Sequence, residues 1–374
     1  LFATMVLRAT DAGAFDLDAP LARHWTDPDL ADDARHAEIT ARLALSHQTG
    51  LPNWRGGQPL AFKFDPGTGH EYSGEGFEYV RRAVERASGE NMRELMARHV
   101  VDPAGMKSTW FGWNTELEGR VATGFDEQKR PIDMAYLQQR APNAAANTFT
   151  SVRDYARFLA WVAGGAGLTE ARLDDMTRPR AAYDDPAEFF SLGWRVIRIP
   201  TGTVLSHDGR ENGVRTQAWI QPDSGEGLVI LTNSSNGELM PRPLAEQILS
   251  YGSELMDRTD RDTWHWILAQ PPEAHQPMLG YIARSPSFVS KLLHAVANGA
   301  IAPLDAELAR QAEHHIAPLV LALHQQRITA DDVARLFARL IEPESSPPVL
   351  RPAYGHNWAV AWVEAVSELA AAAP

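Results

Sequence analysis

The stretch Leu45–Pro52 reads LSHQTGLP and decides how the surrounding chain is interpreted. The apolar run Ile39–Ser46 leads into it with the spacing of a short helix, and its glycine and proline then favour a turn. A second turn is expected at Asp65–Thr68. Residues Glu75–Ala87 next show the apolar spacing of an amphipathic helix. The sequence therefore predicts helices joined by turn-rich loops on both sides of this stretch.

The chain opens with apolar residues at helical spacing, namely Phe2, Met5, Val6 and Ala9. No residue suited to capping a helix precedes them. An uncapped apolar helix end is a poor beginning for a fold, because its first backbone N–H groups lack partners. We therefore expect a buried first helix and further residues upstream of Leu1.

Downstream, the hydrophobic pattern changes from helical to β-rich. Helical periodicity over Asn91–Val101 and Ser151–Ala163 gives way to short runs of β-branched and aromatic residues bounded by turn residues. These runs are 192–199, 203–206, 215–221 and 228–232, and a helix over 239–256 follows them. The pattern predicts an α+β fold, in which an antiparallel sheet is flanked by helices and an all-helical cluster lies beside it.

The C-terminal part of the chain has a helical pattern throughout, interrupted by proline-rich connectors. We expect two parts, a main domain over residues 1–256 and a helical C-terminal extension over residues 257–374. The extension carries no catalytic motif, and its tryptophans are typical of a packed core. We expect it to dock on the main domain, either covering a site or mediating homo-oligomer formation.

Composition excludes several classes of function. The net charge of −13 opposes binding to nucleic acid, and no apolar run is long enough for a membrane span. The chain has no cysteine, which excludes cysteine nucleophiles, thiolate metal sites and disulfides and is compatible with a periplasmic or secreted protein. Its histidines lack the spacing of metal ligands. We expect neither a metal nor a cofactor.

Several segments together resemble the penicillin-recognising serine hydrolases, the class C β-lactamase-like group that includes penicillin-binding-protein-like esterases and D-aminopeptidases. The resemblance covers residues 1 to about 250, on the expected helices, loops and strands. The segments that carry it are 1–21, 45–52, 66–77, 147–154, 192–194, 207–209 and 231–233. The resemblance implies a β-lactamase/transpeptidase-like sheet and hydrolysis of an ester, amide or peptide through an acyl-enzyme.

The family carries three site motifs: Ser-x-x-Lys, Tyr-x-Asn, and Lys-Thr-Gly or His-x-Gly. By resemblance, Tyr72 is the catalytic base, and His207 and Gly209 form the strand-side wall of the site. The backbone N–H of Arg210 would be one oxyanion donor. A tyrosine has a pKa of about 10 and becomes a useful base only beside a positive charge, which the motif lysine would supply.

Two positions depart from the family pattern. Gly74 stands where the family has the asparagine of Tyr-x-Asn, whose carboxamide contacts the amide on the acyl side of the substrate. His207 stands where many members have lysine, and a neutral histidine attracts a substrate carboxylate less strongly. Both departures weaken the case for a strict β-lactamase and favour an ester substrate, while D-aminopeptidase-like amide substrates stay open.

No serine in the chain is followed by a lysine three residues later. By alignment with the motif, the nucleophilic serine and its lysine are expected immediately upstream of Leu1. Two other classes of protein compete with the interpretation as a Ser-x-x-Lys hydrolase. An α/β-type Ser-His-Asp hydrolase would need a Gly-x-Ser-x-Gly elbow, which is lacking. A catalytically inactive binding or sensor protein on the same scaffold remains open.

Overall fold

The computed structural model describes residues 1–126, 130–182, 188–235, 237 and 240–259. The described chain divides into two compact units. The first comprises Leu1–Gly124, Asp133–Arg210 and Thr216–Thr232, and the second contains the remaining described residues. The predicted helical extension over 257–374 lies outside the described residues except at its first three positions, so the predicted domain boundary stays a prediction.

Five helices of the first unit form where the sequence predicted them, namely α1 (Phe2–Asp11), α2 (Ala41–Leu45), α3 (Gly74–Ser88), α4 (Met92–Met96) and α5 (Val152–Ala163). A further helix, α6 (Glu170–Thr177), was not predicted. Residues Ala97–Val101 continue α4 as a π-helical turn. Short 3₁₀ turns lie at Leu21–Arg23, Pro28–Leu30, Ala34–Glu38, Thr115–Leu117 and Ala135–Gln139.

Side chains at the N-caps explain why these helices begin where they do. Thr40, Ser73, Asn91 and Ser151 each accept a backbone N–H from the first turn of α2, α3, α4 and α5. Such a bond satisfies one of the N–H groups that a helix start leaves without a partner. Gly89 ends α3 in the left-handed conformation, as a glycine at this position commonly does.

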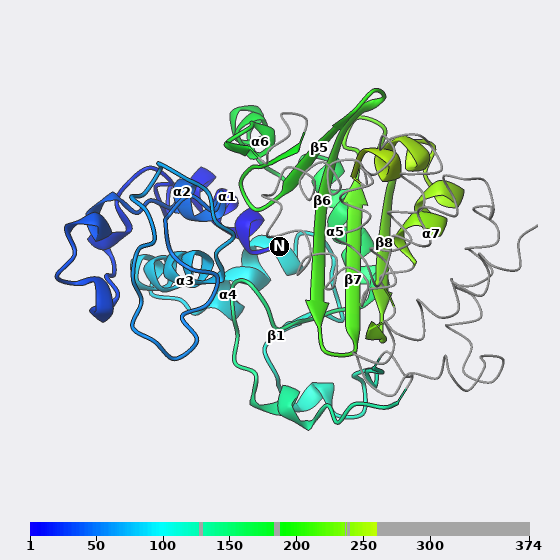
Figure 1. Ribbon diagram of the computed structural model, residues 1–374, viewed down its shortest axis with the longest axis horizontal. Coiled ribbons are helices and arrows are strands. Elements are labelled where there is room, and N and C mark those ends of the chain that lie inside the picture. Colours follow the sequence, from blue (N-terminus) through cyan, green and yellow to red (C-terminus); the bar gives the residue numbers. More distant parts are fainter. Residues whose placement is uncertain (127–129, 183–187, 236, 238–239, 260–374) are drawn as a thin grey trace, which may run out of the picture. The chain divides into compact units, whose positions relative to one another are not determined.

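The main sheet has six strands, and each pairs with the next along the chain (Figure 1). They are β3 (Ala181–Ala182), β4 (Glu188–Phe190), β5 (Arg195–Ile199), β6 (Gly202–Glu211), β7 (Val214–Ile220) and β8 (Gly227–Thr232). β1 (Trp110–Phe111) pairs separately with β2 (Thr148–Phe149). The sequence prediction of an antiparallel meander is therefore confirmed, and the short strands β3 and β4 are additions to it.

Two predicted strand limits were wrong. The run predicted to begin at Leu192 enters the sheet only at Arg195, because Gly193 adopts a left-handed turn conformation with φ 76°. The run predicted to end at Ser206 continues to Glu211, because backbone pairing carries β6 through polar residues without apolar alternation. The second correction places His207, Gly209 and Arg210 within a strand.

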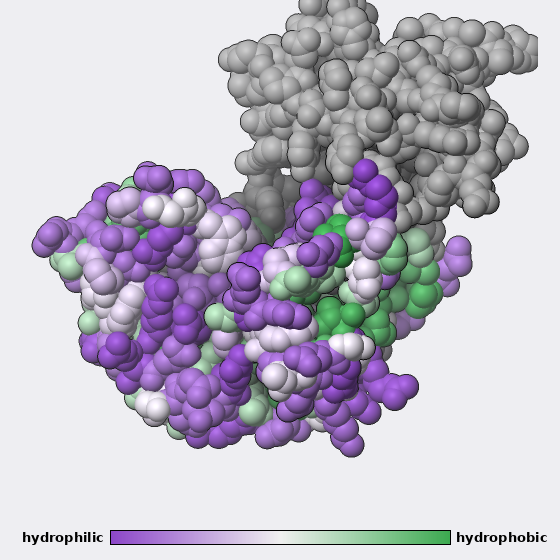
Figure 2. All heavy atoms as spheres, turned by 90° about the horizontal axis from the view of Figure 1, so that it is seen from below, coloured by the Kyte–Doolittle hydropathy of each residue, from purple (hydrophilic) through white to green (hydrophobic). Residues whose placement is uncertain are grey.

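The core of the first unit joins the helices to the sheet. Met5, Val6 and Leu7 of α1 are fully buried, as predicted for the opening segment. On α5, Phe158 stacks on Trp194 with the ring centroids 6.1 Å apart. Figure 1 shows α5 behind the strands and α1–α4 gathered beside the sheet. The described surface in Figure 2 is mostly hydrophilic, as the acidic composition leads one to expect.

In the second unit, α7 spans Pro241–Ile248. The sequence predicted one helix over 239–256, and this continuity was wrong. Leu249 is extended, with φ −92° and ψ 134°, and helical structure resumes only at residues 252–259. At the break, Gly252 lies so close to the backbone of Ala245 that a Cβ would stand 2.0 Å from the carbonyl oxygen.

No described helix is both long and apolar enough to cross a membrane.

Candidate active site

Tyr72, the predicted base, lies in the loop that leads into α3. Its side chain is 42% exposed, and its ring lies 4.3 Å from that of His47 and 5.9 Å from that of Phe190, measured between centroids. The next residue, Ser73, caps α3 by accepting the Gly76 N–H at 2.9 Å. The helix cap therefore fixes the backbone that carries Tyr72, while the phenol remains accessible to a substrate.

His47 accepts two hydrogen bonds from the backbone of this loop, a role that the sequence did not predict. Its Nδ1 accepts the Ser73 N–H at 3.0 Å, and its carbonyl oxygen accepts the Glu71 N–H at 3.0 Å. The residue is buried and adopts a left-handed backbone conformation with φ 59°, which non-glycine residues rarely do. The motif LSHQTGLP was the available signal, but the sequence did not say which residue its histidine contacts.

The buried position of His47 keeps its ring neutral. Burial, together with the electrostatic influence of His70 and His207, lowers the pKa of His47 to about 3. A neutral imidazole has one ring nitrogen free to accept, which matches the bond from the Ser73 N–H. His47 is thus suited to positioning the loop and its tyrosine rather than to exchanging protons near neutral pH.

His207, Gly209 and Arg210 lie near the end of β6. His207 is half-buried, with its Nδ1 2.9 Å from the carbonyl oxygen of Asp208. Burial lowers the pKa of His207, and the carboxylate of Asp208 opposes this effect. Arg210 is exposed.

Gly209 faces the neighbouring strand β7. A Cβ at this position would stand 2.6 Å from Oγ1 of Thr216. Real Cβ contacts are essentially never that short, so a side chain at position 209 would require Thr216 to move. This cross-strand contact is a reason for glycine in addition to the role in the strand-side wall that the resemblance implies.

Several predicted site segments come together at one place. Burial raises the pKa of Tyr72, and the nearby carboxylate of Asp208 raises it further, which places the phenol beside β6. Gly193 donates its N–H to the carbonyl of Leu45 at 2.9 Å and lies against Ala3 of α1. The end marked N in Figure 1 accordingly lies between the helical cluster and β6.

Gly74 is the first residue of α3 and is buried. Its N–H donates to the side-chain oxygen of Asn53 at 3.1 Å. The indole of Trp54 lies directly over its Cα, so that a Cβ would stand 2.6 Å from Cη2 and Cζ2 of that ring. The position where the family carries an asparagine is therefore closed by a residue from another loop.

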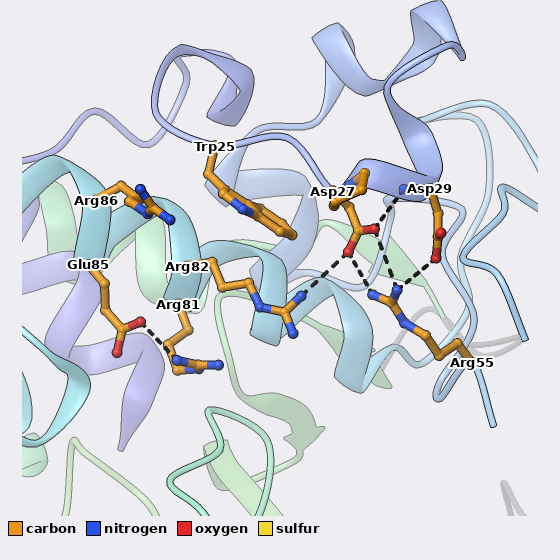
Figure 3. A pocket seen from close by; sticks show the side chains of 9 residues that line it. Trp25, Asp27, Asp29, Arg55, Arg81, Arg82, Glu85 and Arg86 are labelled. Atoms are coloured by element: carbon orange, nitrogen blue, oxygen red, sulfur yellow. Dashed lines mark hydrogen bonds and ion pairs between the residues drawn. The ribbon is translucent and has the colours of Figure 1, made fainter. Parts of the chain in front are cut away.

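A cavity of about 540 Å³ lies elsewhere, between α3 and the loops at residues 25–29 and 55, and no predicted site residue lines it (Figure 3). Arg55 reaches Asp27 at 2.7 Å and Asp29 at 2.9 Å, while Arg82 lies 3.4 Å from Asp27. Burial raises the pKa of Asp27, but hydrogen bonds from Arg55 and from a backbone N–H outweigh it, and the pKa is lowered overall. These ion pairs join loops to α3, which is a structural role.

Within the described part of the chain, no group of three or more histidine, aspartate or glutamate side chains could hold a metal ion.

Comparisons with known proteins agree with this architecture. Over 254 residues the chain is 22% identical to an unguisins hydrolase of Aspergillus violaceofuscus, covering 55% of this chain and 45% of the relative. Over 233 residues it is 22% identical to penicillin-binding protein 4* of Bacillus subtilis, covering 52% and 51%. The chain thus spans about half the length of the curated relatives it matches.

Among solved structures, D-amino acid amidase from Ochrobactrum anthropi superposes with a TM-score of 0.52 at 23% identity, covering 62% of this chain and 76% of the amidase. That similarity supports the fold. A family model described as Beta-lactamase matches residues 1–253, which is more than half of the chain. This chain belongs to the Beta-lactamase family.

Proposed function

We propose that the protein is a serine hydrolase that cleaves an ester or an amide through an acyl-enzyme, with Tyr72 as the general base. One observation carries the proposal. The ring of Tyr72 lies against Phe190 of β4 and its phenol is near Asp208 of β6, while Ala3 at the start of α1 packs against Gly193, just before β5. An acyl-transfer site needs a base, a nucleophile and oxyanion donors within reach of the same carbonyl group.

The nucleophile and its lysine are proposed to precede Leu1, on the helix that α1 continues. In the described residues the pKa of Tyr72 is raised, first by burial and then by Asp208. The phenol is therefore protonated near neutral pH unless a cation stands beside it. The ammonium of a Ser-x-x-Lys lysine would favour the phenolate and so counter both effects.

The reaction then proceeds in two steps, acylation of the serine and hydrolysis of the acyl-enzyme. The phenolate of Tyr72 takes the hydroxyl proton as the serine oxygen attacks the carbonyl carbon. Backbone N–H groups, with that of Arg210 proposed as one donor, stabilise the oxyanion. Collapse breaks the bond to the leaving group, which receives the proton from Tyr72. Water then hydrolyses the acyl-enzyme by the same sequence in reverse.

The substrate is proposed to be a small ester or amide. Two names support hydrolysis of a carboxylic acid derivative. One relative is an unguisins hydrolase, and one similar structure is a D-amino acid amidase that was determined with D-phenylalanine. Gly74 and His207 lack the carboxamide and the permanent positive charge that would anchor a β-lactam or peptide. At most weak β-lactamase activity is therefore proposed.

The test uses the complete polypeptide as its gene encodes it, after intact-mass and N-terminal sequence determination. Tyr72→Phe should reduce kcat for 4-nitrophenyl acetate by about 100-fold or more, as loss of a general base does. The matched control is Tyr155→Phe, because Tyr155 lies on α5 and packs against Phe158. It should retain activity, and both variants should keep the circular dichroism spectrum of the parent.

A serine-reactive phosphonate should label one serine upstream of Leu1. Equal turnover in the parent and in Tyr72→Phe would overturn the role of Tyr72. Absence of both labelling and turnover in the complete polypeptide would overturn the enzyme proposal and leave a binding or sensor protein on this scaffold.

A further inference from the structure

The indole of Trp54 occupies the space that a side chain at position 74 would need. Gly74 does not have a positive φ, so its backbone would accept any ordinary residue. The obstacle to a side chain is the indole of Trp54, whose Cη2 and Cζ2 would lie 2.6 Å from a Cβ and whose Cε2 would lie 2.9 Å from it. A side chain at position 74 therefore requires the indole to move.

The indole is also unusually accessible for its size. Trp54 is 46% exposed and Tyr72 is 42% exposed, and they are two of the five large hydrophobic residues exposed in the described part of the chain. Tyr72 begins the short segment Tyr72–Gly74, and Trp54 lies against its last residue. The indole therefore exposes apolar surface at the segment that carries the proposed base.

The loop that carries Trp54 is fixed to the segment that carries Tyr72. Ser73 Oγ donates to the carbonyl of Pro52 at 2.8 Å, Gly74 donates to the Asn53 side chain at 3.1 Å, and the Glu75 N–H donates to the Asn53 carbonyl at 3.0 Å. These bonds come from three consecutive residues. They hold the loop backbone on one side of Trp54.

On the other side of Trp54, Arg55 holds the loop. Its N–H donates to Glu75 Oε1 at 3.1 Å. Its guanidinium forms ion pairs with Asp27, Asp29 and Glu75, the first two of which are visible in Figure 3. The backbone beneath the indole is therefore anchored before a ligand arrives, which reduces the entropy lost on binding.

We propose that Trp54 forms the apolar wall of the acyl-side subsite and selects substrates with an aromatic acyl group. The inference rests on the proposed function, because Trp54 acquires this role from its contact with Gly74, two residues after the proposed base. By the resemblance, position 74 meets the acyl part of the substrate. Here that space is occupied by an indole, which binds other rings through aromatic contacts and offers no carboxamide to a peptide.

Two activated esters test the proposal, because they share a leaving group and differ only in the acyl group. In the complete polypeptide, Trp54→Ala should lower kcat/KM for 4-nitrophenyl phenylacetate about tenfold, within the range that an aromatic pair supports. The loss should reside mainly in KM. The value for 4-nitrophenyl acetate should stay within about twofold, and Trp54→Phe should lie between the parent and the alanine variant.

Trp161→Ala is the matched control. It removes an indole from α5 that contacts Arg8 and Phe158, and it should leave the ratio of the two esters unchanged. Thermal unfolding of each variant verifies that the chain is folded at the assay temperature.

A second pair of variants tests the exclusion itself. Gly74→Asn should lower turnover of both esters, because the new side chain forces the indole out of its place and the displaced ring obstructs the acyl-side subsite. Adding Trp54→Ala to Gly74→Asn should restore turnover of the acetyl ester and increase the relative rate for 4-nitrophenyl N-acetylglycinate, whose acyl group carries an amide.

The possible failures are distinguishable. If the parent turns over both esters but Trp54→Ala changes both equally or neither, the specificity role of Trp54 is overturned and the proposed function stands. If the parent turns over neither ester and no serine is labelled by the phosphonate, both proposals are overturned.

Discussion

The rings of His47 and Tyr72 lie 4.3 Å apart between centroids, inclined by 32°. The same imidazole accepts the N–H of Ser73, the residue that caps α3. One buried side chain therefore sets both the ring position of Tyr72 and the backbone from which it projects. The interaction connects the turn after α2 with the loop before α3, so the position of the proposed base depends on both segments.

Replacing His47 should affect catalysis through Tyr72. His47→Ala should lower kcat for an activated ester about tenfold or more, since it removes the ring contact and leaves the Ser73 N–H without its acceptor, and it should lower the free energy of unfolding by about 1–3 kcal/mol. His47→Asn keeps a residue that tolerates the left-handed backbone and can accept a hydrogen bond, so it should recover much of the stability. Parallel ester kinetics and urea unfolding are the measurements. Unchanged kcat in the alanine variant would contradict the positioning role.

The low pKa of His47 predicts acid destabilisation. The folded-state pKa is about 3, and that of an unfolded histidine is about 6.5. As the pH falls below about 6.5, the unfolded chain takes up the proton first, so stability present above that pH is lost as the pH approaches 3. Burial lowers the pKa of the neighbouring His70 and His207 in the same direction.

The contribution of His47 amounts to about 3 kcal/mol between pH 6.5 and 4. His47→Asn should therefore flatten the dependence of the free energy of unfolding on pH over this interval, relative to the parent. Urea unfolding at half-unit pH steps measures it. Identical slopes for the variant and the parent would show that His47 is not the group responsible.

Gly209 and Thr216 should behave as a coupled pair. Gly209→Ala should lower stability by about 1–3 kcal/mol, the usual cost of overpacking, because its Cβ would meet Thr216 Oγ1. Thr216→Ala removes that oxygen, so the double variant should be more stable than the sum of the single effects predicts. Chemical denaturation of all four proteins gives the coupling energy. Additive effects would mean that the crowding is relieved in another way.

Comparing the double variant with the parent in ester hydrolysis separates the two reasons for glycine at position 209. If crowding by Thr216 is the only reason, activity should return with stability. If stability returns and activity does not, the space above Gly209 is needed by the substrate.

Replacing Arg55 should lower the free energy of unfolding far more than replacing the nearby Arg86. Arg55→Gln leaves Asp27, whose side chain is 3% exposed, with the longer contact to Arg82 as its remaining ion pair among the described residues. Losing one partner of a buried ion pair commonly costs about 3–5 kcal/mol, and the partly exposed Arg55 should fall at or below the low end. Arg86 lines the same cavity, is exposed and forms no ion pair among the described residues, so Arg86→Gln should change stability by less than about 0.5 kcal/mol. Guanidinium unfolding of the two variants measures the difference. Equal losses of stability in both variants would contradict the structural role of these ion pairs.

Much of the fold was predictable because its signals are local. Asn91 and Ser151 mark helix starts through side chains that bond the first turn, and Gly89 marks a helix end. The meander follows from short β-rich runs separated by turns. Errors arose where pairing or close packing overrode the local pattern, as in the extension of β6 to Glu211 and the break at Leu249.

The sequence by itself determined the family resemblance, the order of the elements and the candidates Tyr72 and His207, because motifs and periodicities are properties of neighbouring residues. Only the tertiary structure decided that His47 supports Tyr72 and that Trp54 closes the space over Gly74. Each of these contacts joins loops some twenty residues or more apart in the chain. Local patterns carry no record of such a contact, which forms only when the packed helices bring the loops together.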